Sequence, residues 1–265
     1  MSAPLEITSK DNPLLVRLRR LAREPGAYRK AGEVWLEGEH LGSALLARGL
    51  RPAQAVVAHS AWQQPALRAL AQCAPRVVLI SDALFDGLSG LESPARIGLL
   101  LSLPPAAPIA ADAPSLVLDR VQDAGNVGSM LRSAAAFGFT QVLALQGTAA
   151  LWSPKVLRAG MGAHFGLRLV EGLQPADLQA LAVPLVGTSL ATEALLPEAQ
   201  LPWPCAWVMG HEGQGVAPTL LARCALTLRI PQPGGEESLN VAAAAAVCLY
   251  ESQRQRHPRR GPRRG

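Results

Sequence analysis

The feature that most constrains the fold of this chain is a proline-dense segment near its middle. Residues 103–114 contain four prolines in twelve positions. Proline lacks a backbone N–H donor and fixes its φ angle, so a stretch this rich in proline cannot continue a helix or a central strand. The sequence therefore predicts a linker at 103–114 between two separately folded parts.

The part before the linker, residues 1–102, alternates helical and strand-like patterns. Asn12 followed by Pro13 is a typical helix start, and leucines at helical spacing follow it. Strands are expected at 34–36, 55–58, 77–80 and 97–101, and further helices at 41–48, 63–71 and 82–87. This pattern predicts a small α/β domain. It contains no acid–base pair or glycine-rich phosphate loop, so we expect it to bind a substrate rather than to carry out chemistry.

The part after the linker, residues 115–252, has strand-like segments that are nearly continuous apolar runs. They are expected at 115–118, 141–145, 185–188, 206–209 and 225–230. Continuous apolar strands separated by helices indicate a parallel sheet that is covered on both faces. In such sheets ligands bind in the loops at the carboxyl ends of the strands, and the informative residues of this chain lie in those loops.

The net charge of +5 resides at the C-terminus, where residues 251–265 hold six arginines against one glutamate. We expect residues 253–265 to form a basic, disordered tail. Such a tail attracts polyphosphates such as RNA by counterion release, although a merely solubilising role explains the same charge. A second basic patch is expected on the first helix, where a solvated helix face is the alternative interpretation. Its members are Arg17, Arg19, Arg20 and Arg23.

The sequence also argues against membrane, secreted and metal-binding classes. Its apolar stretches are too short or too rich in proline to cross a bilayer, and the N-terminus lacks a signal-peptide pattern. The four cysteines are scattered, without the paired spacing of a metal site, and are expected as buried thiols in a reducing compartment. We therefore expect a cytoplasmic protein with no metal and no membrane partner.

The first of three informative loops, residues 119–135, contains Asn126 and, six positions later, Arg132. If a helix begins near Val127, Arg132 falls on its second turn and can lie beside the loop. Its planar, permanently charged guanidinium suits a phosphate there. The alternative is that Asn126 only caps the helix and that Arg132 is an exposed helix charge.

The second and third loops each follow an apolar strand. Residues 210–216 contain three glycines and Glu212, which can hydrogen-bond a ribose or an amine or can simply cap the next helix. Their histidine is expected to be a surface residue without a role. Residues 231–241 contain Ser238 and Asn240 ahead of an alanine-rich helix, with Ser238 as a plain helix cap in the alternative interpretation. No loop is decisive alone.

Taken in order, the three loops resemble the signature motifs of the SpoU/TrmH family of SPOUT-class methyltransferases. The matching stretches are Asn126-Val-Gly-Ser-Met-Leu-Arg132-Ser-Ala, Val208-Met-Gly-His-Glu212-Gly-Gln-Gly, and Ile230-Pro through Glu237-Ser-Leu-Asn240-Val. Order, spacing and strand context agree over residues 115–250. Residues 7–39 look like the substrate-binding domain of the same family, a ribosomal-protein-like α/β module.

This resemblance implies a C-terminal α/β domain with a parallel sheet and a deep trefoil knot, a homodimer, and S-adenosylmethionine as the cofactor. Residue patterns alone would not predict a knot, because knots are nearly absent from protein folds. Four residues match the family's cofactor-binding positions and would act largely through backbone groups. They are Thr188, Gly210, Ile230 and Leu239.

The resemblance also implies methyl transfer to a ribose 2'-hydroxyl of RNA, with five residues at the family's catalytic positions. They are Asn126, Arg132, Glu212, Ser238 and Asn240. Family proposals make Arg132 the activator of the hydroxyl. A guanidinium with a pKa above about 12 is a poor base, so we expect it to hold a phosphate and to stabilise alkoxide charge. In this family the arginine and the cofactor can come from different subunits.

Two positions depart from the family pattern. Ala124 stands where the family usually has proline, which should loosen its loop slightly. Gly160 replaces a frequent serine, and the handling of RNA should differ here if that serine contacts RNA.

The N-terminal domain looks like that of the branch that modifies ribosomal RNA, which favours 23S ribosomal RNA as the substrate, with transfer RNA as the runner-up. Two other classes are kept as alternatives: a family fold that binds RNA without catalysis, and a nicotinamide-dependent enzyme. The presence of every motif side chain argues against the first. The absence of a Gly-x-Gly-x-x-Gly motif after an N-terminal strand argues against the second.

Overall fold

The computed structural model of the chain describes residues 3–103, 105–234 and 238–256. The chain divides into two compact units, each with a sheet of its own. The first unit comprises Met1–Pro105 and Trp152–Phe165, and the second comprises Ala106–Leu151 and Gly166–Gly265. The inclusion of residues 152–165 in the first unit was not expected from the sequence pattern.

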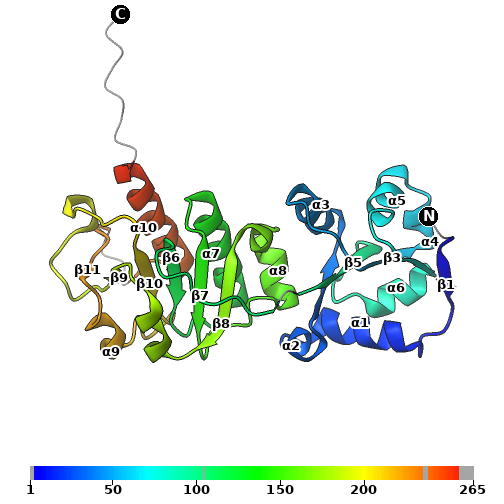
Figure 1. Cartoon of the computed structure of the whole chain (residues 1–265), viewed down its shortest axis with the longest axis horizontal. Coiled ribbons are helices and arrows are strands. Elements are labelled where there is room, and N and C mark those ends of the chain that lie inside the picture. The colour runs from blue at the N-terminus through cyan, green and yellow to red at the C-terminus, as the bar shows by residue number, and fades with distance from the viewer. Residues whose placement is uncertain (1–2, 104, 235–237, 257–265) are drawn as a thin grey trace, which may run out of the picture. The chain divides into compact units, whose positions relative to one another are not determined.

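The first unit contains a five-stranded mixed sheet in the order β1-β4-β3-β5-β2 (Figure 1). Its strands are β1 (Leu5–Ile7), β2 (Glu33–Glu37), β3 (Gln54–Ala58), β4 (Val77–Ile80) and β5 (Ile97–Ser102). Its helices are α1 (Pro13–Arg23), α2 (Ala27–Ala31), α3 (Glu39–Ala47), α4 (His59–Trp62), α5 (Pro65–Ala71), α6 (Asp82–Leu88) and α8 (Pro154–Gly160). Helices α1 and α6 pack on one face of the sheet, and α3 and α5 pack on the other (Figure 1).

Local sequence explains the element boundaries of this unit. The Asn12 side chain accepts a hydrogen bond from Leu14 N–H at 2.9 Å and caps α1, as predicted. The helix expected at 63–71 is α5, which begins at Pro65, where the missing N–H of proline does no harm. The short helix α4 just before it was not expected. Strand β1 was not expected, since it has only three residues and its first two are exposed.

The arginines of α1 are all engaged within the first unit. Arg17 pairs with Glu33 at 3.0 Å, and Arg20 pairs with Glu24 at 2.7 Å. The other two donate to backbone carbonyls. These bonds are Arg19 to Lys10 O at 3.2 Å, and Arg23 to Gly87 O at 2.8 Å and Ser89 O at 3.3 Å. The basic patch predicted on this helix is therefore largely committed to intramolecular partners.

The second unit is built on a six-stranded sheet in the order β11-β9-β10-β6-β7-β8, and every strand pair in it is parallel. Its strands are β6 (Ser115–Leu118), β7 (Gln141–Leu145), β8 (Arg168–Leu173), β9 (Leu185–Thr188), β10 (Ala206–Met209) and β11 (Leu226–Leu228). The predicted parallel sheet is confirmed. Strand β8 was missed because it lies at the sheet edge, where Val170 is its only buried residue and no apolar run forms.

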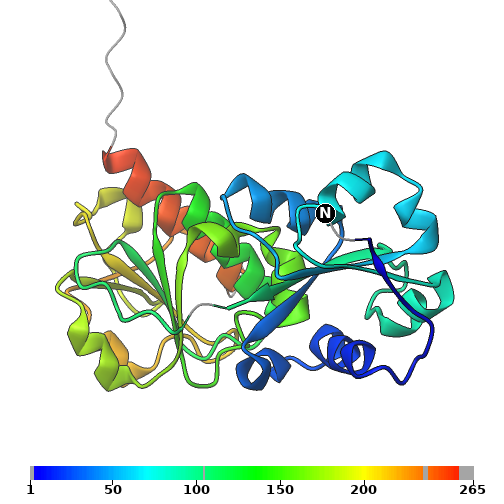
Figure 2. The same cartoon turned by 45° about the vertical axis from the view of Figure 1, so that its right-hand side comes forward.

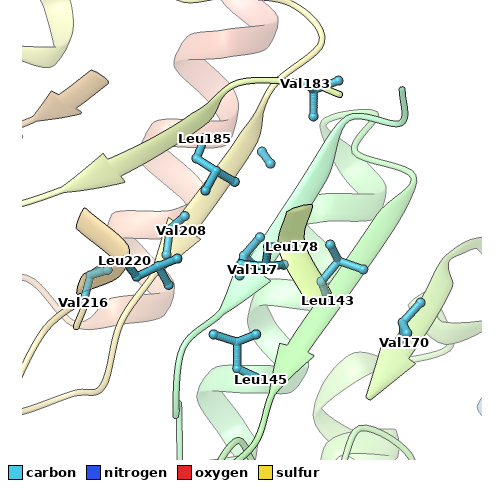
Figure 3. Close-up of a cluster of buried hydrophobic side chains, with 11 residues drawn as sticks. Val117, Leu143, Leu145, Val170, Leu178, Val183, Leu185, Val208, Val216 and Leu220 are labelled. Carbon is cyan, nitrogen blue, oxygen red and sulfur yellow. The ribbon is translucent and has the colours of Figure 1, made fainter. Parts of the chain in front are cut away.

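Helices α7 (Ala124–Ala136) and α10 (Val241–Arg256) pack against each other and against this sheet (Figure 2). The Trp207 indole of β10 donates to the Ser252 hydroxyl of α10 at 2.8 Å. The other face of the sheet carries an apolar cluster in which Val117 and Val208 lie near Leu178 and Leu220 (Figure 3). Those two leucines come from the 3-10 helix η2 (Pro175–Ala180) and from α9 (Pro218–Leu221).

The predicted linker forms neither a helix nor a strand in its described residues. Its second half is nevertheless bonded to the second unit. Ala110 N–H donates to the Gln141 side chain at 2.7 Å, and Ala182 N–H donates to Ala111 O at 3.0 Å. Proline removes backbone donors here, but the remaining amides and carbonyls still find fixed partners.

The C-terminal helix runs further than expected. Residues 253–256, predicted to be part of a disordered tail, form the last turn of α10. Gln255 explains the extension, because its side chain donates to Ala199 O at 2.9 Å and to Glu251 at 2.8 Å. The remainder of the predicted tail, residues 257–265, lies outside the described residues.

Candidate active site at the strand ends

The candidate site forms where strands β6, β10 and β11 end. Strands β6 and β10 are adjacent and parallel, with Leu118 opposite Met209 at their carboxyl ends. The loops that follow them therefore leave the sheet at the same edge. The loop after β11 completes the set, because it leads into α10, which packs against α7.

Glu212, in the loop after β10, holds the first turn of α7. One carboxylate oxygen accepts from Asp123 N–H at 3.0 Å and from the Asn126 side-chain amide at 3.1 Å. The other accepts from Gln122 N–H at 3.2 Å. A carboxylate at a helix N-terminus is also favoured by the helix dipole. Glu212 thus joins the second motif loop to the first.

Asn240 joins the third loop to the same point. Its side-chain NH2 donates to the Asn126 side-chain oxygen at 3.0 Å. Its own oxygen accepts from Ala242 N–H at 2.9 Å and from Ala243 N–H at 3.2 Å, which caps α10. A continuous chain of hydrogen bonds, Asn240 to Asn126 to Glu212, therefore links all three predicted loops.

The caps are not the residues considered from the sequence. Asp123 caps α7 by accepting from Asn126 N–H at 2.7 Å, and the helix begins at Ala124, three residues before Val127. Asn126 is therefore not the cap, and Arg132 falls on the third turn rather than the second.

Two of the predicted catalytic residues stand apart from this network. Arg132 is exposed on α7, and within the described part of the chain its guanidinium forms no hydrogen bond or ion pair. Ser238 is exposed as well, and its hydroxyl makes no hydrogen bond to a described residue. Both side chains therefore keep their hydrogen-bonding capacity.

The pKa of Glu212 lies below its ordinary value. Partial burial raises it, but the hydrogen bonds from Asp123, Asn126 and Gln122 outweigh burial because they favour the charged form. Both oxygens are also engaged as acceptors. This carboxylate is therefore a brace for the loops and is poorly suited to accept a proton from a substrate.

A cavity of about 560 Å³ opens beside this network. All four predicted cofactor-binding residues line it: Thr188, Gly210, Ile230 and Leu239. Glu212 and Ser238 line it as well. Its volume falls in the range of small-molecule sites, and it combines apolar walls with a few polar groups, as such sites do.

Two details of the cavity fit S-adenosylmethionine. A Cβ on Gly210 would overlap the backbone of Gly215 and Val216, so glycine alone allows this close turn beside the cavity. Gln232 lines the cavity, and its side-chain oxygen is buried and accepts no hydrogen bond from any described residue. An unpaired buried acceptor is costly unless a ligand supplies a donor.

Sequence reasoning missed a clamp formed by Asp119 and Arg120. Asp119 is only 3% exposed, binds the Arg120 guanidinium at 2.9 Å and accepts from Ala217 N–H at 2.8 Å. Arg120 also donates to the Gln214 side chain at 2.9 Å and has a left-handed φ of 58°. A charged residue directly after a buried strand was a signal that could have identified this clamp.

The structure also describes two further positions considered in the sequence analysis, His211 and Gly160. His211 is half-buried, and its Nδ1 accepts from Gly213 N–H at 3.0 Å, so it stabilises the turn of its own loop. At Gly160 any side chain would overlap the buried ring of His164, which accounts for glycine at this position. Nothing in the structure tests a role of this segment in binding RNA.

No helix in the described part of the chain has the length and apolar character needed to span a membrane. Among the same residues, no cluster of three or more histidine, cysteine or acidic side chains could hold a metal ion.

Comparison with known proteins decides the family. The sequence profile described as the SpoU rRNA Methylase family matches residues 113–250, which include all three loops. The chain belongs to the SpoU methylase family. It is 35% identical to the 23S rRNA (guanosine(2553)-2'-O)-methyltransferase RlmP of Bacillus subtilis over 175 residues, covering 65% of this chain and 70% of that one.

Solved structures extend the similarity to SpoU methylases over almost the whole chain. A crystal structure of an RNA 2'-O ribose methyltransferase superposes with a TM-score of 0.78 at 32% identity, covering 95% of this chain and 99% of the other. The SpoU methyltransferase AviRb from Streptomyces viridochromogenes, solved with the cofactor AdoMet, gives a TM-score of 0.82 at 25% identity, covering 92% and 98%.

Proposed function

We propose that this SpoU-family chain transfers a methyl group from S-adenosylmethionine to a ribose 2'-hydroxyl of RNA, with 23S ribosomal RNA as the favoured substrate. The observation that carries the proposal is the chain of hydrogen bonds from Asn240 through Asn126 to Glu212 beside the cofactor-sized cavity. It brings the three motif loops together at one edge of the sheet, where parallel sheets bind their ligands.

The cavity residues would hold the cofactor. Backbone groups of Thr188, Gly210, Ile230 and Leu239 line it and can contact the adenosine part. When bound, S-adenosylmethionine supplies a methyl group that its positively charged sulfur has already activated. The protein must then mainly hold the ribose hydroxyl in line with that methyl group and stabilise the charge left on the oxygen.

Arg132 is the group suited to that charge. It is exposed and unpaired within the described residues, so it can bind the RNA phosphate next to the reacting ribose. Its permanent charge would also stabilise the alkoxide that develops as the 2'-hydroxyl loses its proton. The new O–CH3 bond forms as the S–CH3 bond breaks, and the proton passes to solvent.

The remaining side chains would position the ribose. The Ser238 hydroxyl is uncommitted, and the side-chain NH2 groups of Asn126 and Asn240 each retain one hydrogen after making their bonds in the network. These donors and acceptors suit sugar hydroxyls. Glu212 would act indirectly, by holding Asn126 in place, because its lowered pKa and occupied oxygens make it a poor base.

The choice of RNA rests on relatives. RlmP of Bacillus subtilis is named for methylating guanosine 2553 of 23S rRNA. The predicted RNA-binding domain at 1–102, the linker at 103–114 and the catalytic domain at 115–252 complete this proposal. Transfer RNA is the second candidate substrate.

We further propose that the chain acts as a homodimer. Val247 and Tyr250 on α10 are 41% and 54% exposed, and the ring of Tyr250 packs edge-on against Phe137 at the end of α7, 5.8 Å away. Large exposed apolar side chains that share a surface favour association with another protein surface. Light scattering should give the mass of two chains for the native protein and of one chain for Tyr250→Asp.

A trefoil knot in the second unit is part of the proposal. Strand β11 lies at the edge of the sheet, yet the chain that leaves it returns to α10, which packs on α7 and β10. The proposed location is the cytoplasm, since all four cysteines are free thiols and burial raises the pKa of Cys224 to about 11.

The direct test of activity is incubation with S-adenosylmethionine labelled in its methyl group. Unmodified 23S rRNA and unmodified tRNA are offered separately, and the digested nucleosides are analysed. We expect a labelled 2'-O-methylnucleoside from 23S rRNA and much less from tRNA. Label in tRNA alone would select the second candidate, and label in neither RNA would reject the proposed function.

A further inference from the structure

Gln232 occupies an unusual position in the cofactor cavity. It follows β11 by a few residues and lines the cavity together with Ile230 and Leu239. Its side-chain oxygen is fully buried, and no described residue donates a hydrogen bond to it. A buried carbonyl oxygen without a donor costs about 1–3 kcal/mol, so folded proteins rarely leave one unpaired without a reason.

Neighbouring backbone groups do not supply the missing donor. The two residues that flank Gln232 in the chain are Pro231 and Pro233, and proline has no backbone N–H. Gly234, two residues on, has the N–H that most often bonds such a side chain, but it does not donate to the Gln232 oxygen. A turn of the Gln232 side chain would bring its amide to the cavity that this residue lines.

S-adenosylmethionine carries three kinds of donor: the adenine amine, the ribose hydroxyls and the ammonium of its amino acid end. A buried neutral amide between apolar side chains is a poor partner for an ammonium, which loses much hydration free energy when buried. The adenine ring is the flat, apolar end of the cofactor and suits the walls formed by Ile230 and Leu239.

A carboxamide is also the side chain that matches adenine geometrically. In nucleic-acid recognition Gln and Asn bind adenine with two hydrogen bonds, accepting from the exocyclic amine and donating to a ring nitrogen. We therefore propose that Gln232 reads the adenine of the cofactor through its side chain, which makes it a specificity residue in addition to the backbone contacts expected of this cavity. This inference rests on the proposed use of S-adenosylmethionine.

The test measures cofactor discrimination by calorimetry, without RNA and without turnover. The two probes are S-adenosylhomocysteine and S-inosylhomocysteine, in which a carbonyl oxygen replaces the adenine amine. Native protein should bind the adenine compound more tightly by roughly 5- to 150-fold, which corresponds to the discrimination of one two-bond amide–base pair. Gln232→Met, which is similar in length and lacks the amide, should reduce this preference by about fivefold or more.

Gln253 provides a matched control. It lies on α10, outside the residues that line the cavity, and its side-chain oxygen is likewise buried and unpaired within the described residues. Gln253→Met removes the same chemical group and should keep the native preference for the adenine compound. Thermal unfolding of both variants checks that they are folded.

The outcomes are separable. A native protein that binds both compounds equally, or a folded Gln232→Met protein that keeps the native preference, overturns the role of Gln232 and leaves the proposed methyl transfer intact. Failure of the native protein to bind either compound would instead count against the proposed function.

Discussion

The arginines of α1 in the first unit and Arg132 of α7 in the second unit are used in opposite ways. In the first unit Arg17, Arg20 and Arg23 on α1 bind carboxylates or backbone carbonyls of the same unit. In the second unit Arg132 on α7 is exposed and unpaired within the described residues. A count of positive charges would rank α1 above α7 as a place for RNA. The hydrogen-bond partners of these arginines favour α7 instead, because a guanidinium that is already paired has fewer free donors for an RNA phosphate.

A similar contrast separates particular carboxylates. In the first unit the exposed pair of Arg20 and Glu24 joins residues only four positions apart. In the second unit Asp119 and Glu212 each join loops that are far apart in the sequence. Asp119 and Glu212 thus fix loop geometry, while the Arg132 guanidinium and the Ser238 hydroxyl make no hydrogen bond to a described residue.

The largest expected effect follows from Arg132. Arg132→Ala should lower the rate of methyl transfer by about 10²- to 10³-fold, the usual loss on removing a group that stabilises developing negative charge. The affinity for S-adenosylhomocysteine, measured by calorimetry, should stay unchanged because Arg132 does not line the cavity. Arg17→Ala in the first unit is the control and should leave turnover nearly intact. An equal loss of turnover in both variants would show that Arg132 is no more important for methyl transfer than Arg17.

The second largest effect concerns Asp119. Asp119→Ala leaves Arg120 without its carboxylate partner and Ala217 N–H without its acceptor, so unfolding in denaturant should show a loss of about 3 kcal/mol in the free energy of unfolding. Glu24→Ala, which removes an exposed pair of the first unit, should leave the stability nearly unchanged. Similar losses for the two variants would show that the clamp is no stronger than a surface pair.

The two units should also differ in how well they tolerate alanine in place of a glycine. Gly210→Ala places a methyl group against the backbone of Gly215 and Val216, and should cost about 2 kcal/mol and weaken cofactor binding. Gly87→Ala, on α6 of the first unit, meets nothing within 4 Å and should be neutral or stabilise by about 0.5 kcal/mol. In thermal unfolding, the Tm should therefore fall for Gly210→Ala and should stay unchanged or rise for Gly87→Ala.

The smallest expected effect is a pH dependence from Glu212. Its pKa is lower in the folded protein than in the unfolded chain, so its stabilising contribution is complete above the unfolded value of about 4.3. The contribution is lost as the pH falls through the lower folded value. Binding of S-adenosylhomocysteine should be insensitive to Glu212 from pH 8 to about pH 5 and should weaken below that range.

Glu212→Gln is the control for this pH effect, since it cannot titrate. Its binding curve should lack the additional acid-side loss seen in the native protein. Parallel curves for the two proteins would mean that another group is responsible.

Much of the fold could be predicted because buried parallel strands leave a simple signal. Strands β6, β7, β9 and β10 coincide with the predicted ranges, since every residue in them except Thr188 is buried and the apolar run is unbroken. Strands β1 and β8 were missed because edge strands expose part of their residues. The return of 152–165 to the first unit depends on contacts far apart in the sequence, which no local pattern encodes.

The candidate site was also predicted only in part from the sequence. The sequence identified the three loops, and the structure places Asn126, Glu212 and Asn240 in one hydrogen-bonded chain. The sequence could not reveal that Asp123 rather than Asn126 caps α7. Several residues of this loop can cap a helix, and only the geometry of the fold selects one of them. The clamp of Asp119 and Arg120 was overlooked for a related reason: its partners Gln214 and Ala217 are about a hundred positions away.

The central claim is that the second unit methylates a ribose of ribosomal RNA and that Arg132 is essential to the reaction. The most direct measurement maps 2'-O-methylated nucleotides in 23S rRNA from cells that lack this protein and from the same cells complemented with the native or the Arg132→Ala chain. We expect at least one ribose to lose its methyl group in the deletion, to regain it with the native chain and to stay unmethylated with Arg132→Ala. An unchanged methylation map in the deletion, or full restoration by Arg132→Ala, would contradict it.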